Sequence, residues 1–214
     1  MATRIPAAQD KMRKEPRQER SRDTVEAIVQ ASAHILGRRG WGGLTTNGVA
    51  EAAGVSIGSL YQYFPNKLAL VEAVRSRHFQ DVLTALRAAD DTSKSPAQRI
   101  EAVVEGMISV HSRNPAVHHT LLEETPRSRT SKAAHDAFET EYMRRYEALI
   151  STSRRAHRFA VPSIAAQVLS AAIAGVVHDA ARRCTLGSPA LKQELVHMIT
   201  AYLCKSPRTE NRRV

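Results

Sequence analysis

The residues most suited to binding chemistry stand together in one short stretch. Residues 56–59, Ser-Ile-Gly-Ser, have short or flat side chains, which suit the start of a helix that enters a DNA major groove. Ile57 can contact a thymine methyl group there, and the hydroxyl groups of Tyr61 and Tyr63 can donate hydrogen bonds to phosphate oxygens. Lys67, at the start of a further helix, makes a phosphate site together with the free N–H groups of that helix. These residues predict a surface that binds nucleic acid.

A helix, a glycine turn and a second helix would position these side chains. Thr45 or Thr46 can cap a helix over about residues 46–53, and Gly54 suits its end because glycine readily adopts the left-handed backbone conformation. Ser56 can cap the next helix almost at once. This order is typical of the helix-turn-helix arrangement. The alternative is a tight helical hairpin in which the tyrosines belong to the core.

This stretch resembles the DNA-binding domain of TetR/AcrR-type transcriptional regulators. The resemblance rests on Gly-Trp-x-x-Leu-Thr-Thr at 40–46, Ala-Gly-Val-Ser at 53–56 and Gly-Ser-Leu-Tyr-x-Tyr-Phe at 58–64, and it covers about residues 21–75. It implies a homodimeric repressor that binds a palindromic operator in double-stranded DNA. It also implies an unknown small-molecule effector, which binds the C-terminal domain and releases the DNA. The residues then expected at the DNA are Thr45, Thr46, Asn47, Ser56, Ile57, Gly58, Ser59, Tyr61, Tyr63 and Lys67.

Hydrophobic periodicity and the placement of prolines predict an all-α chain of about nine helices. We expect a three-helix helix-turn-helix domain followed by a C-terminal helical domain for ligand binding and dimerisation. Gly37 and Gly40 should end the first helix, Leu60 and Phe64 should be core, and Trp41 should pack between the first and fourth helices. The helices are expected over about residues 23–36, 46–53, 56–62, 66–88, 96–112, 116–123, 131–156, 163–183 and 189–204. The expected domains are a basic flexible arm over 1–20, the helix-turn-helix domain over 21–66, the effector and dimerisation domain over 67–204 with a connecting helix at 67–88, and a polar tail over 205–214.

Composition narrows the class of protein further. The 214 residues carry a formal net charge of +10, which favours a polyanionic partner, but the basic residues are spread over both halves of the chain. Two cysteines, Cys184 and Cys204, make neither a disulfide framework nor a four-cysteine zinc site, so a cytoplasmic setting is expected. Residues 159–177 lack charge, but Pro162 and Gln167 among them favour a buried helix over a membrane span.

No catalytic motif accompanies the binding residues. The sequence contains no His-Glu-x-x-His, paired-cysteine, Gly-x-Ser-x-Gly or phosphate-loop pattern, so we expect no enzyme, no catalytic residue, no metal and no cofactor. Glu123 and Glu124 are interpreted as part of a solvated loop, with a charged-ligand site as the alternative. A broadly specific or architectural DNA-binding protein without an effector, and a metal or redox sensor, remain as alternative functions.

The basic N-terminal arm has two possible roles. It could follow the DNA backbone or enter the minor groove, or it could be a solvated tail. If it binds DNA, its deletion should flatten the salt dependence of binding. The cations concerned are Lys11, Arg13, Lys14, Arg17, Arg20 and Arg22.

Small and apolar residues form a stripe along the alanine-rich helix near 163–183, and the last helix adds larger ones. Small residues let helices approach closely, the resemblance implies a dimer, and one short helix-turn-helix contacts too few bases alone. We therefore expect both helices to pair with their symmetry mates in a homodimer. The alternative is that they are buried within one subunit. The expected interface residues are Ile164, Val168, Ala171, Ala172, Gly175, Val176, Leu195, Met198 and Tyr202.

An effector pocket is expected among the fifth to eighth helices. Such pockets are mostly apolar with a few polar groups. Any one of these residues could instead be ordinary core or surface. The candidate lining residues are His111, His118, Leu122, Phe138, Tyr142, Tyr146 and His178.

Overall fold

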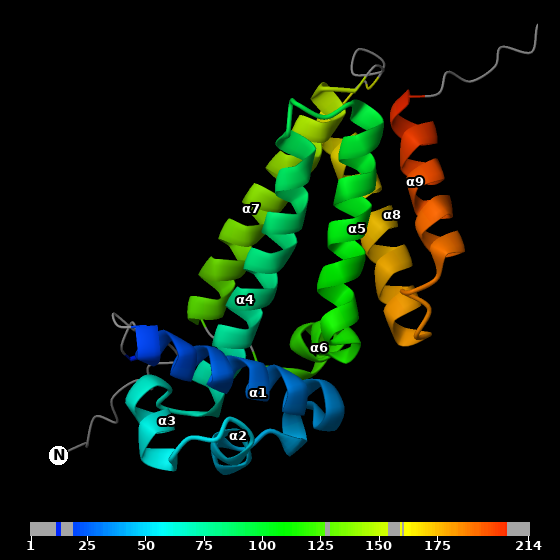
Figure 1. Cartoon of the computed structure of the whole chain (residues 1–214). Coiled ribbons are helices and arrows are strands. Elements are labelled where there is room, and N and C mark those ends of the chain that lie inside the picture. The colour runs from blue at the N-terminus through cyan, green and yellow to red at the C-terminus, as the bar shows by residue number, and fades with distance from the viewer. Residues whose placement is uncertain (1–11, 14–18, 127–128, 154–158, 160, 205–214) are drawn as a thin grey trace, which may run out of the picture. The chain divides into compact units, whose positions relative to one another are not determined.

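The computed structural model describes residues 12–13, 19–126, 129–153, 159 and 161–204 (Figure 1). In this part of the chain there are nine α-helices, one 3-10 helix, one π-helix and no strand, which confirms the all-α prediction. The elements are α1 (Glu19–Gly43), α2 (Thr46–Ala52), α3 (Ile57–Tyr63), α4 (Lys67–Arg87), η1 (Ala88–Asp90), α5 (Pro96–Arg113), α6 (Pro115–His119), η2 (Thr120–Glu124), α7 (Arg129–Ser151), α8 (Pro162–Arg182) and α9 (Pro189–Cys204). The polar tail and nearly all of the basic arm lie outside the described residues.

The chain divides into two compact units, each built from two stretches. The N-terminal unit contains residues 1–81 and 113–138, and the C-terminal unit contains residues 82–112 and 139–214. Helices α5, α6, α8 and α9 each begin at a proline, as expected from the fixed φ of proline and its missing N–H group.

Helix α1 continues beyond the point where the sequence predicted its end. It runs through Gly37 to Gly43, with non-helical angles at Gly40, where φ is 64°. A Cβ atom on Gly37 would lie 3.2 Å from Cγ2 of Val117, so this glycine permits close packing of α1 against α6. The prediction that Gly37 ends the helix was therefore wrong, because Gly37 serves a tertiary contact.

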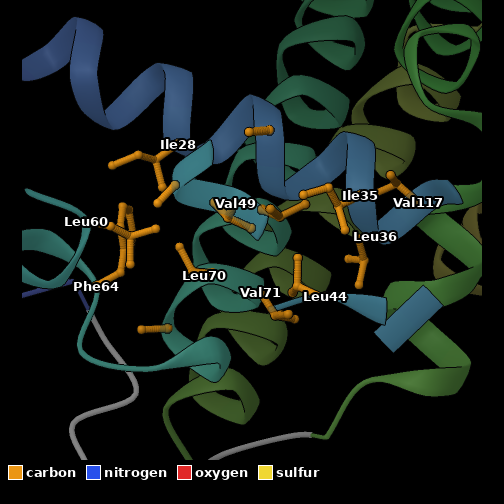
Figure 2. Close-up of a cluster of buried hydrophobic side chains, with 14 of the residues drawn as sticks. Ile28, Ile35, Leu36, Leu44, Val49, Leu60, Phe64, Leu70, Val71 and Val117 are labelled. Carbon is orange, nitrogen blue, oxygen red and sulfur yellow. The ribbon is translucent and has the colours of Figure 1, made fainter. Parts of the chain in front are cut away.

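The N-terminal unit is held together by one hydrophobic core. Figure 2 shows Ile28 and Leu36 of α1 gathered with side chains of α2, α3, α4 and α6. Leu60 and Phe64 are fully buried in it, as predicted. Trp41 is half-buried and packs against the same core. The core fixes the angle between α2 and α3 and so positions the side chains that these helices present to solvent.

The predicted single helix over residues 116–123 was wrong. The described structure has the short helix α6, which ends at His119, followed by the π-helix η2. The carbonyl of Leu121 accepts hydrogen bonds from the Thr125 hydroxyl at 2.8 Å and from the Arg75 guanidinium at 3.2 Å. These side-chain donors compete with the backbone N–H groups of the following turn, which explains the departure from α-helical geometry.

In the C-terminal unit, α8 buries one face and exposes the other. Leu169, Ile173 and Val177 are buried, whereas Ile164 and Val168 are 53% and 52% exposed. Helix α8 is also long and apolar enough to cross a membrane, with a mean hydropathy of 1.5, a property that core helices share. The buried face indicates a core helix within this unit.

Candidate nucleic-acid interface

The turn between α2 and α3 has the geometry that the sequence predicted. The Thr45 hydroxyl accepts a hydrogen bond from the N–H of Gly48 at 3.1 Å, so Thr45 rather than Thr46 caps α2. Gly54 has φ 66°, in the left-handed region that glycine favours. Ser56 caps α3 by accepting from the N–H of Ser59 at 3.0 Å. Two short helices are thereby joined with a tight turn.

The start of α3 presents a nearly uncharged surface. Ile57 is 38% exposed, and Ser56 and Gly58 are also exposed. Ser59 is half-buried, and its hydroxyl lies 2.9 Å from the Ser56 hydroxyl. Small apolar and hydroxyl side chains such as these can contact base edges without the help of a charged side chain.

Helices α2 and α3 meet at a pair of hydroxyl groups. The Thr46 hydroxyl lies 3.1 Å from the Tyr61 hydroxyl, and Tyr61 is 42% exposed. Asn47 follows Thr46 and is exposed. The structure thus brings together Thr46, Asn47 and Tyr61, which the sequence assigned to DNA contact from separate helices.

The other tyrosine, Tyr63, lies in a different environment. Its side chain is half-buried and packs against the core of the N-terminal unit, while its carbonyl accepts the N–H of Arg13 at 2.8 Å. Met12 packs against the same core. A piece of the basic arm is therefore attached at the C-terminal end of α3, a contact for which the sequence holds no local signal.

Lys67 stands at the first residue of α4, above the ring of Trp41. Its ammonium nitrogen lies 3.9 Å from the centroid of the Trp41 ring, a cation–π contact. Partial burial lowers the pKa of Lys67. The Asn66 side chain accepts from the N–H of Ala69 at 2.8 Å and caps the helix. Sequence reasoning placed Lys67 correctly at the helix start but missed its aromatic partner.

The expected effector residues are divided between the two units. In the C-terminal unit, the rings of His111 and His178 lie 5.1 Å apart, and those of Tyr142 and Tyr146 lie 4.9 Å apart. Burial, with a smaller contribution from the neighbouring His111, lowers the pKa of His178 to about 4. Burial also lowers the pKa of His111 and raises the pKa of both tyrosines. These four groups are uncharged at neutral pH.

The remaining effector candidates belong to the N-terminal unit. A ring nitrogen of His118 lies 2.8 Å from one of His78, and the Phe138 ring stacks on Phe79 with centroids 4.1 Å apart. Sequence reasoning missed both α4 partners, although Phe79 stands three residues before the apolar Val82 and seven before Leu86, a spacing typical of one helix face. Leu122 lies in η2, and its side chain is outside the described part of the chain.

The expected dimer residues on α8 remain accessible in the single chain. Ile164, Val168, Ala171 and Gly175 are exposed, and Ala172 and Val176 are half-buried, as are Met198 and Tyr202 on α9. Leu195 is only 2% exposed and belongs to the interior of the C-terminal unit. The expectation that Leu195 forms part of the interface is corrected by this burial, because the side chain has almost no surface to offer.

A capped helix, a glycine turn and a second helix with an exposed, uncharged start define a helix-turn-helix DNA-binding protein. Residues 28–74 match the family described as "Bacterial regulatory proteins, tetR family", and residues 95–203 match "Tetracyclin repressor-like, C-terminal domain". The chain belongs to the tetR family of transcriptional regulators. This membership confirms the resemblance in the N-terminal part and extends it to the C-terminal domain.

Individual relatives cover about half of the chain. It is 31% identical over 111 residues to the nucleoid occlusion factor SlmA of Haemophilus ducreyi, covering 52% of this chain and 54% of the relative. It is 30% identical over 103 residues to the HTH-type transcriptional repressor KstR of Mycolicibacterium smegmatis, covering 48% and 50%. The chain thus spans about half the length of the curated relatives it matches.

Among solved structures, the fold is similar to that of AibR in complex with isovaleryl coenzyme A and operator DNA. The TM-score is 0.62 at 18% identity, covering 84% of this chain and 97% of that chain. At this identity the likeness shows the shared fold alone.

Proposed function

We propose that the protein is a homodimeric repressor that binds a palindromic operator and leaves it when a small molecule binds the C-terminal domain. The observation that carries the proposal is the exposed start of α3, with Ile57 and Gly58 accessible and Ser56 capping the helix. A capped helix end without charge suits direct contact with base edges in a major groove. For a protein in this role we expect no enzymatic activity and a location in the cytoplasm.

We assign contacts with DNA phosphates to residues around the exposed start of α3. Tyr61 and Lys67 lie at the ends of α3 and α4, where their polar groups can bind the DNA backbone. Thr46 and Asn47 add contacts from the start of α2. Tyr63 is half-buried against the core, and its hydroxyl is the group that we assign to a backbone contact.

Two copies are required because one short helix reads few base pairs. The accessible apolar face of α8, around Ile164 and Val168, is the proposed subunit contact. A two-fold symmetric dimer would place its recognition helices about 34–36 Å apart, one turn of DNA. The proposed effector site lies in the C-terminal unit, at the uncharged histidine and tyrosine pairs.

A second candidate function is a DNA-binding protein that acts without an effector. This candidate is supported by the similarity to a nucleoid occlusion factor, which extends over about half of the chain. The two candidates share the same DNA-binding surface, and a selection experiment followed by ligand tests separates them.

Selection of bound sequences from random duplexes tests the proposal. We expect one palindrome with half-sites a helical turn apart, bound far more tightly than bulk DNA. Ser59→Ala should change the preferred bases, while Lys67→Ala should weaken binding to every duplex. Recovery of unrelated sequences, with affinity that disappears at moderate salt, would contradict the repressor and favour the broadly specific alternative.

A further inference from the structure

An acidic residue from the second stretch of the N-terminal unit contacts the backbone of Trp41. Glu124, the last residue of the π-helix η2, accepts a hydrogen bond from the Trp41 N–H at 3.2 Å. The two residues are 83 positions apart in the sequence. The contact joins η2 to the end of α1.

The backbone at the end of α1 is shaped to admit this carboxylate. Gly40 has φ 64°, and a Cβ atom there would lie 2.6 Å from Oε2 of Glu124. The positive φ favours glycine at this position, and a side chain there would displace the Glu124 carboxylate. The absence of a side chain on Gly40 therefore leaves room for the carboxylate that accepts the Trp41 N–H.

The π-helix that carries Glu124 is itself attached to α4. Arg75 is 4% exposed, and its guanidinium donates to the Leu121 carbonyl at 3.2 Å and to the Thr125 hydroxyl at 2.6 Å. Glu72 forms an ion pair with the same guanidinium. These hydrogen bonds and the ion pair of the buried Arg75 guanidinium fix η2 relative to α4.

The side chain of Trp41 contacts Lys67. The lysine ammonium lies 3.9 Å from the ring centroid. A continuous set of contacts therefore runs from Arg75 through η2 and Glu124 to Trp41 and Lys67, all within the N-terminal unit. Its last member is the lysine to which we assign a phosphate contact.

We propose that Glu124 is a positioning residue for DNA binding: by fixing the backbone of Trp41, it holds the ring on which the Lys67 ammonium rests. This inference rests on the proposed phosphate contact of Lys67. The side chain of Glu124 is exposed, so it does not contribute to the core. A negative charge weakens the attraction of this protein to a polyanion. The hydrogen bond that Glu124 accepts explains why an acid is present at this position.

Charge and positioning predict opposite outcomes for the removal of Glu124. Removing a negative charge from a DNA-binding protein raises affinity by electrostatics alone. If Glu124 positions Lys67, Glu124→Ala instead weakens binding, by about three- to tenfold from the loss of one hydrogen bond and its consequence. Glu124→Gln keeps an acceptor and should stay within about twofold of the wild type.

The experiment measures dissociation constants for the selected operator and for a random duplex at several salt concentrations. The variants are Glu124→Ala, Glu124→Gln, Glu124→Asp, Lys67→Ala and the double variant of Glu124 and Lys67 to alanine. Glu124→Asp keeps the charge but shortens the reach, so it should behave like Glu124→Ala. Glu51→Ala, which removes an exposed acid on α2, is the matched control and should not weaken binding.

A double-mutant cycle then distinguishes the two levels of the proposal. Lys67→Ala should weaken binding and reduce the salt slope by about 0.9, the value for one phosphate contact. In that background Glu124→Ala should have little further effect. Additive effects of the two substitutions would overturn the positioning role while leaving the DNA-binding function intact. An unchanged salt slope for Lys67→Ala would remove the phosphate contact and the inference with it.

Trp41 supplies a readout that a general loss of stability would not mimic. It is the single tryptophan of the chain, so its fluorescence reports this position directly. Glu124→Ala and Glu124→Asp should shift its emission at temperatures where the protein is fully folded, and Glu124→Gln should not. Wild-type emission together with wild-type affinity in Glu124→Ala would overturn the proposal.

Discussion

The hydroxyl groups of Thr46 and Tyr61 lie 3.1 Å apart, so the first residue of α2 is joined to the exposed side of α3. This contact orients the Tyr61 ring before any DNA arrives. A tyrosine side chain that is already oriented loses less conformational freedom when it binds a phosphate than a mobile side chain does.

Tyr61→Phe should therefore weaken binding to all duplexes by about two- to tenfold, the effect of one hydrogen bond. The loss of affinity should be equal for the operator and for a random duplex, because phosphate contacts carry no base information. Anisotropy titrations of both duplexes measure it. An effect confined to the operator would assign Tyr61 to base recognition instead.

Gly106→Ala should destabilise the C-terminal unit. A Cβ atom on Gly106 would lie 2.8 Å from Cβ and 3.1 Å from Cα of Ala85, and the second of these belongs to the backbone. Overpacking costs about 1–3 kcal/mol, which exceeds the gain of at most about 1 kcal/mol from better helix propensity. Urea denaturation should show a lower midpoint. Gly42→Ala, which meets no atom within 4 Å, is the control and should not destabilise.

Val168→Glu should prevent association of two chains. The side chain is 52% exposed on α8, so the substitution leaves the fold of one chain intact while placing a charge in the proposed contact. Sedimentation should show monomers, and operator affinity should fall with them. Gln167→Glu, at the neighbouring exposed position, tests the effect of charge alone. A dimeric Val168→Glu protein would exclude this face as the contact.

Stability should decrease between pH 6.5 and pH 4 because of His178. Burial lowers its pKa to about 4 in the folded chain, whereas an unfolded histidine titrates near about 6.5. Above this window both states are neutral and the stability is complete. Within it the unfolded chain binds the proton first, so the free energy of unfolding falls as the pH falls.

His178→Gln should reduce the difference in unfolding free energy between pH 7 and pH 5. Chemical denaturation at both values measures it, and His34→Gln, on the exposed side of α1, is the matched control. Glu141, whose pKa is lowered to about 2 by hydrogen bonds from Arg144 and Arg145, is present in all the proteins compared, so its contribution cancels. Equal pH dependence in His178→Gln and the wild type would contradict the assignment.

The basic arm should contribute to affinity through charge. The N–H of Arg13 is bonded to the Tyr63 carbonyl, which attaches the arm next to α3. Replacing Lys11, Lys14 and Arg17 by glutamine keeps that attachment and should reduce the salt slope by about 0.9 for each phosphate that these cations neutralise. Measuring operator affinity from low to moderate salt tests this expectation. An unchanged slope would leave the arm as a solvated tail.

Local chemistry made α2 and α3 predictable. Gly54 and Ser56 act through their own backbone and nearest neighbours, so their roles could be inferred from residue type and spacing alone. Prolines at helix starts were informative for the same reason. The predicted all-α architecture followed from such signals repeated along the chain.

Contacts between distant segments were not predictable. The residue type of Gly37 suggests a helix end, whereas its actual role, leaving space for Val117 of α6, depends on a residue 80 positions away in the chain. Glu124 was interpreted as part of a solvated loop because its partner Trp41 is equally remote. The π-helical geometry of η2 depends on Arg75, which no local pattern in residues 116–124 reveals.

The exposed apolar face of α8 has a consequence for regulation. If the protein pairs through this face before it binds DNA, as we propose, its occupancy of the operator at low levels rises with the square of the monomer concentration. Small changes in the number of copies per cell would then produce larger changes in transcription. Residues such as Ile164 and Val168, far from the DNA-reading helix in the sequence, would set the threshold at which regulation begins.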